Sequence, residues 1–164
     1  MSEITIKIKG RIICFRKASI SDVEELAKIR MIFLSEATEM RPHEQSMIEM
    51  ANREYLKSAL ADNSLIVWLA VSGDEIIATS GLTFSIIPPY IGCPNGKAAY
   101  IMNMFTFPDY RKHGIGTELL RKNIEETKSR DCKKIGLIST EMGHPLYVKF
   151  GFKDVTDEMY LYIN

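Results

Sequence analysis

The sequence predicts an α/β (α+β) protein in which helices flank one mixed β-sheet, and three observations support this fold class. The chain has 164 residues, which suits a single domain over residues 11–164 preceded by a short arm or an extra strand over residues 1–10. Apolar residues make up 46% of the chain and charged residues 26%, so a real core can form without metal or disulfide staples. Short apolar runs alternate with segments of helical periodicity in the order β-α-α-β-β-β-α-β-α-β.

The N-terminal third predicts one strand and two helices. Residues 11–17 contain a run of apolar side chains that favours a strand. Ser19 or Ser21 then supplies a helix N-cap, and acidic residues follow in the first turn, where the helix dipole favours them. Apolar side chains return with helical spacing after Pro42 and predict a second helix that ends near Ala61.

The middle of the chain predicts three strands. Residues 65–71 form an unbroken apolar run, which is typical of a central strand covered on both faces. A turn at residues 72–74 leads into a hairpin partner over residues 75–84. A loop rich in proline and glycine follows. Residues 98–107 are then a second strongly apolar strand, which Pro108 ends.

The last third predicts helix, strand, helix and strand in turn. Residues 114–129 have an apolar face at helical spacing, and residues 133–139 form a strand. A short helix over residues 145–150 leads to a closing strand over residues 153–163.

Charge and cysteine content argue against several classes of protein. Lysine and arginine total 21, as do aspartate and glutamate, so the chain lacks the basic excess of a general nucleic-acid-binding protein. The longest apolar run falls far short of the ~20 residues that span a membrane. The chain starts without an apolar signal core, and its scattered cysteines form no C-x-x-C pair. We therefore expect a cytoplasmic protein with no nucleic-acid partner, no membrane association and no metal; the cysteines are Cys14, Cys93 and Cys132.

The stretch over residues 108–120 is the one that indicates chemistry, because it joins a strand to an amphipathic helix. Gly114 and Gly116 let the backbone approach a ligand closely, and the unpaired N–H groups of the first helical turn point into the loop. Such a helix start favours phosphate, and Arg111 and Lys112 add cationic donors. The alternative interpretation is a turn that merely needs glycine, with Arg111 on a solvated edge.

Two common phosphate-binding motifs do not fit this stretch. A P-loop needs a lysine before the Ser/Thr that closes it, but Thr117 directly follows Gly116. A dinucleotide fingerprint needs a third glycine where Leu119 stands. The loop therefore indicates an anion cradle of another kind.

Two sequence motifs, which follow one another along the chain, resemble those of the GNAT superfamily of N-acetyltransferases. The acyl-CoA signature [QR]-x-x-G-x-[GA] is matched at residues 111–116, with Pro108 three residues before the arginine. A second block, G-x-x-L-Y-x-x-x-G-F, is matched at residues 143–152. The resemblance covers about residues 11–163. It implies a mostly antiparallel sheet of six or seven strands with about four helices, splayed between the fourth and fifth strands (98–107 and 133–139).

The resemblance also implies the activity, which is transfer of an acetyl group from acetyl-CoA to a primary amine by direct attack in a ternary complex. The pantetheine arm would bond to backbone in the splay, and the loop would hold the pyrophosphate. A backbone N–H near Phe105 would stabilise the oxyanion. Tyr147 would contact the cofactor and protonate the departing thiolate, since a phenol with a pKa of about 10 stays protonated at neutral pH. The implied cofactor-binding residues are Met104, Phe105, Thr106, Arg111, Lys112, His113, Gly114, Ile115, Gly116, Thr117 and Tyr147.

The general base is not evident from the sequence. Many members of the family carry a carboxylate on the central strand just before the cofactor loop, but residues 102–104 here read Met-Asn-Met. Glu141 is one candidate base and is equally consistent with an exposed loop acid. A water chain, or an amine that arrives partly deprotonated, would replace a base altogether.

The acceptor is the least defined part of the prediction. The resemblance implies a small-molecule or peptide amine, and residues 33–45 would shape its site. The acidic residues Glu36, Glu39 and Glu44 would either attract a cationic amine or form a solvated surface. A homodimer is common for the fold, and only analogy supports it here.

Two other functions compete with the enzyme. A non-catalytic acyl-CoA-binding or sensor module fits the missing strand carboxylate, whereas Tyr147 favours catalysis. The second competing function is that of an α/β interaction protein with no CoA site. A metal enzyme is disfavoured because His43, His113 and His144 stand in separate loops without ligand spacing.

Overall fold

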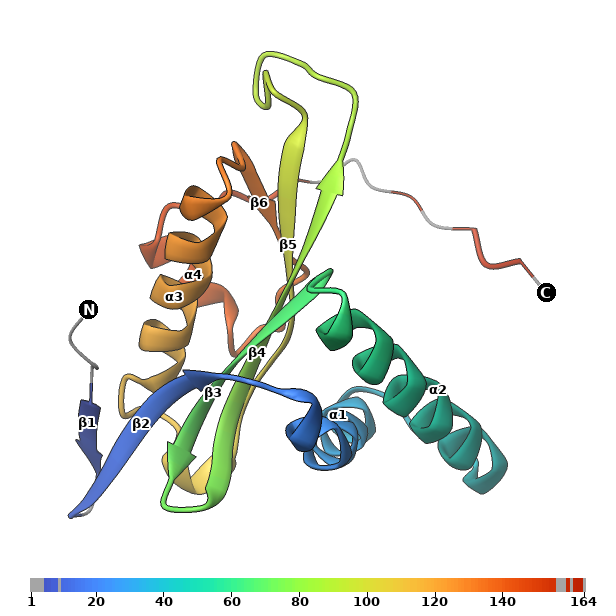
Figure 1. The fold of residues 1–164 in the computed structure, drawn as a ribbon, viewed down its shortest axis with the longest axis vertical. Coiled ribbons are helices and arrows are strands. Elements are labelled where there is room, and N and C mark those ends of the chain that lie inside the picture. Colours follow the sequence, from blue (N-terminus) through green and yellow to red (C-terminus); the bar gives the residue numbers. More distant parts are fainter. Residues whose placement is uncertain (1–4, 9, 156–158, 160, 164) are drawn as a thin grey trace.

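A six-stranded sheet forms the centre of the computed structural model, which describes residues 5–8, 10–155, 159 and 161–163. The strands lie in chain order across the sheet (Figure 1). Neighbours are antiparallel except for the last pair, which is parallel, so the predicted mixed and mostly antiparallel sheet is confirmed. The strands are β1 (Thr5–Ile8), β2 (Arg11–Lys17), β3 (Leu65–Ser72), β4 (Glu75–Ile86), β5 (Lys97–Thr106) and β6 (Lys134–Gly136).

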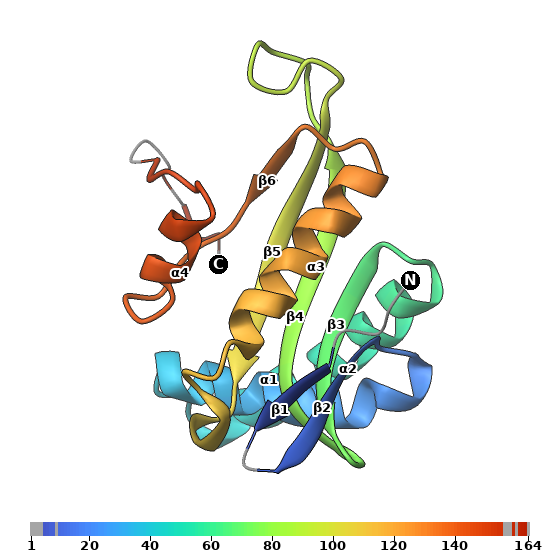
Figure 2. The same ribbon diagram turned by 90° about the vertical axis from the view of Figure 1, so that its left-hand side faces the viewer.

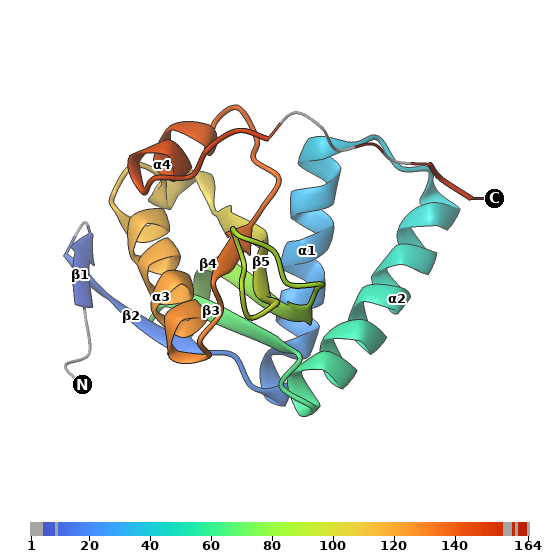
Figure 3. The same ribbon diagram turned by 90° about the horizontal axis from the view of Figure 1, so that it is seen from above.

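Helices cover both faces of the sheet, as Figure 3 shows from above. On one face lie α1 (Val23–Ala37) and α2 (Pro42–Ala61). On the other face α3 (Ile115–Ser129) runs along the sheet, with α4 (His144–Lys149) beside the end of β6 (Figure 2). Two short 3₁₀ turns, Ile20–Asp22 and Pro108–Tyr110, precede α1 and the loop before α3. No helix in the described part of the chain has the length and apolar character that a membrane span requires.

The central strands are apolar on both faces because helices pack on both. In β3, Leu69 and Ala70 are neighbours that point to opposite faces, and both are completely buried. Leu69 packs with the α1–α2 layer, whereas Ala70 belongs to the cluster beneath α3. The unbroken apolar run over residues 65–71 is therefore explained by its central position.

Strand β6 pairs along its whole length with only the beginning of β5. Their register runs from Ala98 opposite Lys134 to Tyr100 opposite Gly136. Strand β5 then continues to Thr106, and β6 has already ended. Residues 101–106 therefore have no strand partner on this side among the described residues, and the predicted splay between these two strands is confirmed.

A β-bulge interrupts the other side of β5. Thr79 pairs with Phe105 and Gly81 pairs with Met102, so two residues of β5 lie opposite Ser80 alone. One of these two, Asn103, has a φ of 53°, in the left-handed region that asparagine tolerates better than most residues. The Thr79 hydroxyl donates to the Asn103 carbonyl over 3.0 Å and fixes the bulge.

The predicted closing strand over residues 153–163 is wrong for the part that the structure describes. Residues 153–155, 159 and 161–163 carry no strand, and residues 156–158 and 160 lie outside the described residues. Val155, Met159 and Leu161 are 76%, 95% and 84% exposed. The alternating pattern is typical of a strand, but a strand also needs a partner that accepts its backbone hydrogen bonds, and these residues lie against none.

Candidate active site

The loop between β5 and α3 ends in the unpaired N–H groups of a helix start. Gly114 precedes α3 with a φ of 84°, and Lys112 has a φ of 62°. The Glu118 N–H donates to the Gly114 carbonyl, so the N–H groups of residues 115–117 have no partner within the helix. Ile115 is buried beneath the sheet and anchors this helix start. The predicted cradle therefore has the backbone geometry that binds phosphate groups.

The side chain of Arg111 is occupied by the protein itself. Its Nε donates to the Thr106 carbonyl over 2.8 Å, and its Nη2 lies 3.3 Å from the Glu36 carboxylate on α1. The guanidinium also lies over the Phe105 ring, 5.7 Å from its centroid. Arg111 thereby ties the loop to the end of β5 and to α1, and the donors that stay free within the helix start are the backbone N–H groups of residues 115–117.

The other predicted loop residues flank this helix start. Lys112 and His113 are exposed, and His113 Nδ1 lies 2.6 Å from the Arg111 carbonyl oxygen. A Cβ built on Gly116 would lie 3.4 Å from Leu146 and 3.7 Å from Met104. The start of α3, the splayed part of β5 and α4 therefore meet at Gly116.

Tyr147 lies on α4, next to Leu146, and is 8% exposed. Its ring packs edge-on against Phe152 with 5.8 Å between centroids, and it belongs to the cluster that contains Leu82 and Leu120. Its hydroxyl makes no hydrogen bond with the described residues. Burial raises the pKa of the phenol above its usual value of 10, so the group is protonated at neutral pH. The residue thus combines the packing role with the protonation state of a general acid.

The candidate base Glu141 is exposed in the turn before α4 and makes no ion pair or hydrogen bond with the residues the structure describes. The three histidines are not brought together. His144 Nε2 lies 2.9 Å from Asp154 Oδ1, and no group of three or more potential metal ligands occurs among the described residues.

The acidic residues that were expected to attract a cationic amine are mostly engaged by arginines. Glu36 pairs with Arg111, as described above. Glu44 pairs with Arg41, whose guanidinium and backbone N–H lower the pKa of the Glu44 carboxyl to about 2. Glu39 is exposed. In this part of the chain, two of the three acidic side chains therefore form ion pairs with arginines and the third is exposed to solvent.

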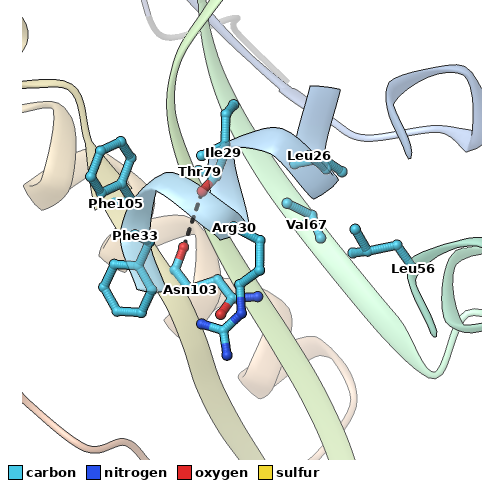
Figure 4. Close-up of a pocket in the computed structure, with 9 residues that line it drawn as sticks. All are labelled: Leu26, Ile29, Arg30, Phe33, Leu56, Val67, Thr79, Asn103 and Phe105. Carbon is cyan, nitrogen blue, oxygen red and sulfur yellow. Dashed lines mark hydrogen bonds between the residues drawn. The ribbon is translucent and has the colours of Figure 1, made fainter. Parts of the chain in front are cut away.

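A pocket opens between α1, α2 and the bulged part of the sheet (Figure 4). It encloses about 310 Å³ of empty space, open solvent at its mouth included. Its lining is largely apolar, with one charged side chain and two polar ones. The lining residues are Leu26, Ile29, Arg30, Phe33, Leu56, Val67, Thr79, Asn103 and Phe105.

The sequence did not single out the polar residues of this pocket. In the sequence, Arg30 falls within the helical spacing of α1, and Asn103 is notable only because no carboxylate stands at residues 102–104. The available signal was Arg30 itself, because a charged residue between Ile29 and Phe33 interrupts an otherwise apolar helix face. Asn103 carried no such signal, since the bulge that places it depends on the pairing of two distant strands.

Comparisons with known proteins agree with this geometry. The acetyltransferase (GNAT) family model matches residues 24–152. A predicted acetyltransferase from Clostridium acetobutylicum, solved with acetyl-CoA, is 32% identical over 92% of this chain and 96% of that one, with a TM-score of 0.83. A GCN5-related N-acetyltransferase from Ralstonia eutropha JMP134 is 30% identical over 92% and 98%, also with a TM-score of 0.83.

A more distant structure shares the fold alone. The aminoglycoside N-acetyltransferase AAC(6')-Iy, in complex with CoA, is 14% identical over 95% of this chain and 97% of that one, with a TM-score of 0.71. Comparison with curated proteins gave no match.

Proposed function

Since the chain belongs to the acetyltransferase (GNAT) family and is an acyltransferase, we propose that it transfers an acetyl group from acetyl-CoA to a primary amine within a ternary complex. The observation that carries this proposal is the meeting of three elements at Gly116: the helix-start cradle, the unpaired edge of β5 and the helix of Tyr147.

The residues present fit the parts of acetyl-CoA. The free N–H groups of residues 115–117 suit a pyrophosphate. Gly116 allows Leu146 and Met104 to pack closely against this helix start. The unpaired edge of β5 over residues 101–106 suits the amides of a pantetheine arm, which would bond to it as an added strand does. This places the thioester near Phe105, where a backbone N–H would stabilise the developing oxyanion.

The reaction then needs one bond formed and one broken. The neutral amine nitrogen attacks the thioester carbonyl, the C–S bond breaks, and the nitrogen loses a proton to water, from which the Tyr147 phenolate is reprotonated after each turnover. Tyr147 would give its phenolic proton to the departing thiolate, which its raised pKa allows at neutral pH. Glu141 is exposed and contacts none of the elements that meet at Gly116 through a hydrogen bond or ion pair among the described residues, so an amine that reaches the site already neutral is the simpler source of the nucleophile.

A non-catalytic acyl-CoA sensor is the second candidate. The observation in its favour is that Asn103 stands two residues before Phe105 on β5, where an amide cannot accept a proton as a carboxylate does. The unpartnered Tyr147 hydroxyl favours the enzyme, because a sensor has no use for a proton donor there.

Two measurements separate these functions. Thermal melting with saturating acetyl-CoA should raise the melting temperature, and no shift would reject both CoA-dependent functions. A free-thiol assay across polyamines, aminoglycosides, amino acids and peptide N-termini should then reveal CoA release with at least one amine class. Acetyl-CoA binding without thiol release across the whole panel would establish the sensor instead. Cytoplasmic location is our expectation from the unpaired cysteines and is tested by fractionation.

A further inference from the structure

Arg30 on α1 differs from every other arginine in the chain. Each of the others makes a hydrogen bond or an ion pair; these are Arg11, Arg16, Arg41, Arg53, Arg111, Arg121 and Arg130. Arg30 makes neither with the described residues, although it is half-buried in the wall of the pocket. Its guanidinium lies over the Phe33 ring, 5.4 Å from the centroid.

An unpaired cation in this position is costly. Burial lowers the pKa of the Arg30 guanidinium, with the nearby Tyr55 acting in the opposite direction, and an arginine nevertheless stays protonated in a protein. Removing a charge from water without a counter-charge destabilises the folded chain. The ring of Phe33 stacks on one face of the guanidinium and leaves its N–H edge free, which is the edge that binds a planar anion in bidentate fashion.

Asn103 supplies a second unmet polar group in the same pocket. Its Oδ1 is buried and has no hydrogen-bond partner. Figure 4 shows the Asn103 side chain, from β5, and the Arg30 side chain, from α1, with their polar ends next to each other in this view. A carboxamide oxygen accepts hydrogen bonds, so the missing partner is an N–H donor. Asn103 stands two residues before Phe105, which lines the pocket as well.

The charge of the pocket selects the class of ligand. None of its lining residues is acidic, and the only formal charge is the positive one on Arg30. The nearby acids Glu36 and Glu44 are paired with Arg111 and Arg41. A polycationic amine would therefore meet an unpaired cation of like charge at this site.

We propose that the acetyl acceptor is a small amine that also carries a carboxylate, as a free amino acid does. The carboxylate binds the N–H edge of Arg30, and the amine donates a hydrogen bond to Asn103 Oδ1, which brings the nitrogen toward Phe105. This assignment rests on the proposed acetyltransferase function and adds the acceptor class to it.

Matched acceptor pairs test the proposal by turnover. Glycine, L-leucine and L-phenylalanine are compared with methylamine, isoamylamine and phenethylamine, which lack only the carboxylate. We expect the amino acids to be the better substrates. Arg30→Gln should raise their KM by roughly 10- to 100-fold, the value of a hydrogen-bonded charge, and leave the KM of the plain amines nearly unchanged. Lys28→Gln removes a charge from the exposed side of the same helix and should change neither.

Binding provides a readout that does not depend on turnover. With CoA present, the same amino acids should raise the melting temperature of the wild-type protein and of Lys28→Gln, but not of Arg30→Gln. Asn103→Gly keeps the left-handed backbone and removes the carboxamide, so it should weaken amino-acid binding as well.

The failure of this proposal differs from the failure of the proposed function. Equal turnover of amino acids and plain amines, or an Arg30→Gln variant with wild-type KM, would overturn the acceptor assignment and leave the acetyltransferase intact. No thiol release with any amine would reject the enzyme. Absence of amino-acid binding in the presence of CoA would reject the carboxylate site itself.

Discussion

Two arginines lie near Phe105, and their situations are opposite. Arg111, on the proposed cofactor side, donates to the Thr106 carbonyl and pairs with Glu36. Arg30, on the proposed acceptor side, has a stacked ring and no polar partner among the described residues. The chain's own contacts thus hold the first side in place, whereas polar groups on the second side have no partner among the described residues. Substitutions on the two sides test this difference.

Tyr147→Phe should lower kcat by roughly 100-fold or more, because the leaving thiolate would lose its general acid. Acetyl-CoA binding and folding should persist, since the hydroxyl has no hydrogen bond to lose among the described residues. The raised pKa keeps the phenol in its active, protonated form below pH 10, so kcat of the wild type should not decline between pH 7 and about pH 9. Steady-state kinetics measures both effects.

Tyr90→Phe is the matched control, because Tyr90 is an exposed residue of the long loop before β5. It should keep wild-type kcat. Unchanged turnover in Tyr147→Phe would remove Tyr147 from the mechanism and return it to a packing role in the core.

Gly114→Ala should raise the Kd for acetyl-CoA by roughly tenfold, because a φ of 84° strains any residue with a Cβ and the helix start would shift. Gly73→Ala is the control. It lies in the turn between β3 and β4 with a φ of 62°, and neither added Cβ meets an atom within 4 Å. Both variants should lose about 1 kcal/mol of stability. Titration calorimetry should show a weaker affinity for acetyl-CoA in Gly114→Ala alone. Equal acetyl-CoA affinity in the two variants would contradict the cradle.

Glu36→Gln should raise the acetyl-CoA Kd by only about threefold, because it removes one of the contacts that hold Arg111. The pair is partly exposed, and such pairs contribute about 0–1 kcal/mol. The effect should shrink at high salt, where the wild-type pair is itself screened. A loss of affinity as large as that of Arg111→Gln would show that Glu36 has a further role.

Arg30→Met should leave the unfolding free energy unchanged or raise it by up to about 1 kcal/mol without ligand, because it replaces an unpaired charge by an apolar side chain. Arg16→Met should instead lower the unfolding free energy, because it leaves the Asp22 carboxylate without its charged partner. Asp22 is buried, and the Arg16 guanidinium, with help from Ser19, holds its pKa at about 2.

Because the pKa of Asp22 is depressed in the folded state, the contribution of its pair with Arg16 is present above pH 4 and is lost as the pH falls toward 2. Urea denaturation at pH 7 should therefore separate the two variants, and at pH 2 the loss in Arg16→Met should largely vanish. Strong destabilisation by Arg30→Met at pH 7 would show that Arg30 has an internal partner.

Elements with a local cause could be predicted from the sequence. The unbroken apolar run over residues 65–71 indicated a central strand, and glycines at 114 and 116 indicated a tight approach at a helix start. The closing strand over residues 153–163 could not be predicted in this way. Alternating polar and apolar residues indicate that a segment is suited to pair as a strand. Whether the edge of another strand lies close enough depends on the rest of the fold.

Local patterns in the chain were enough to predict the family, the layered fold and the helix start with Gly114 and Gly116, because each depends on short-range spacing of glycine, charge and apolar residues. Folding of the whole chain was needed to pair Arg111 with Glu36 and to place Arg30 and Asn103 in the lining of one pocket. These pairs are separated by 75 and 73 positions in the chain, and the bulge in β5 arises from its register with β4. Local patterns cannot specify such contacts, since they exist only once the sheet has formed and α1 has packed on it.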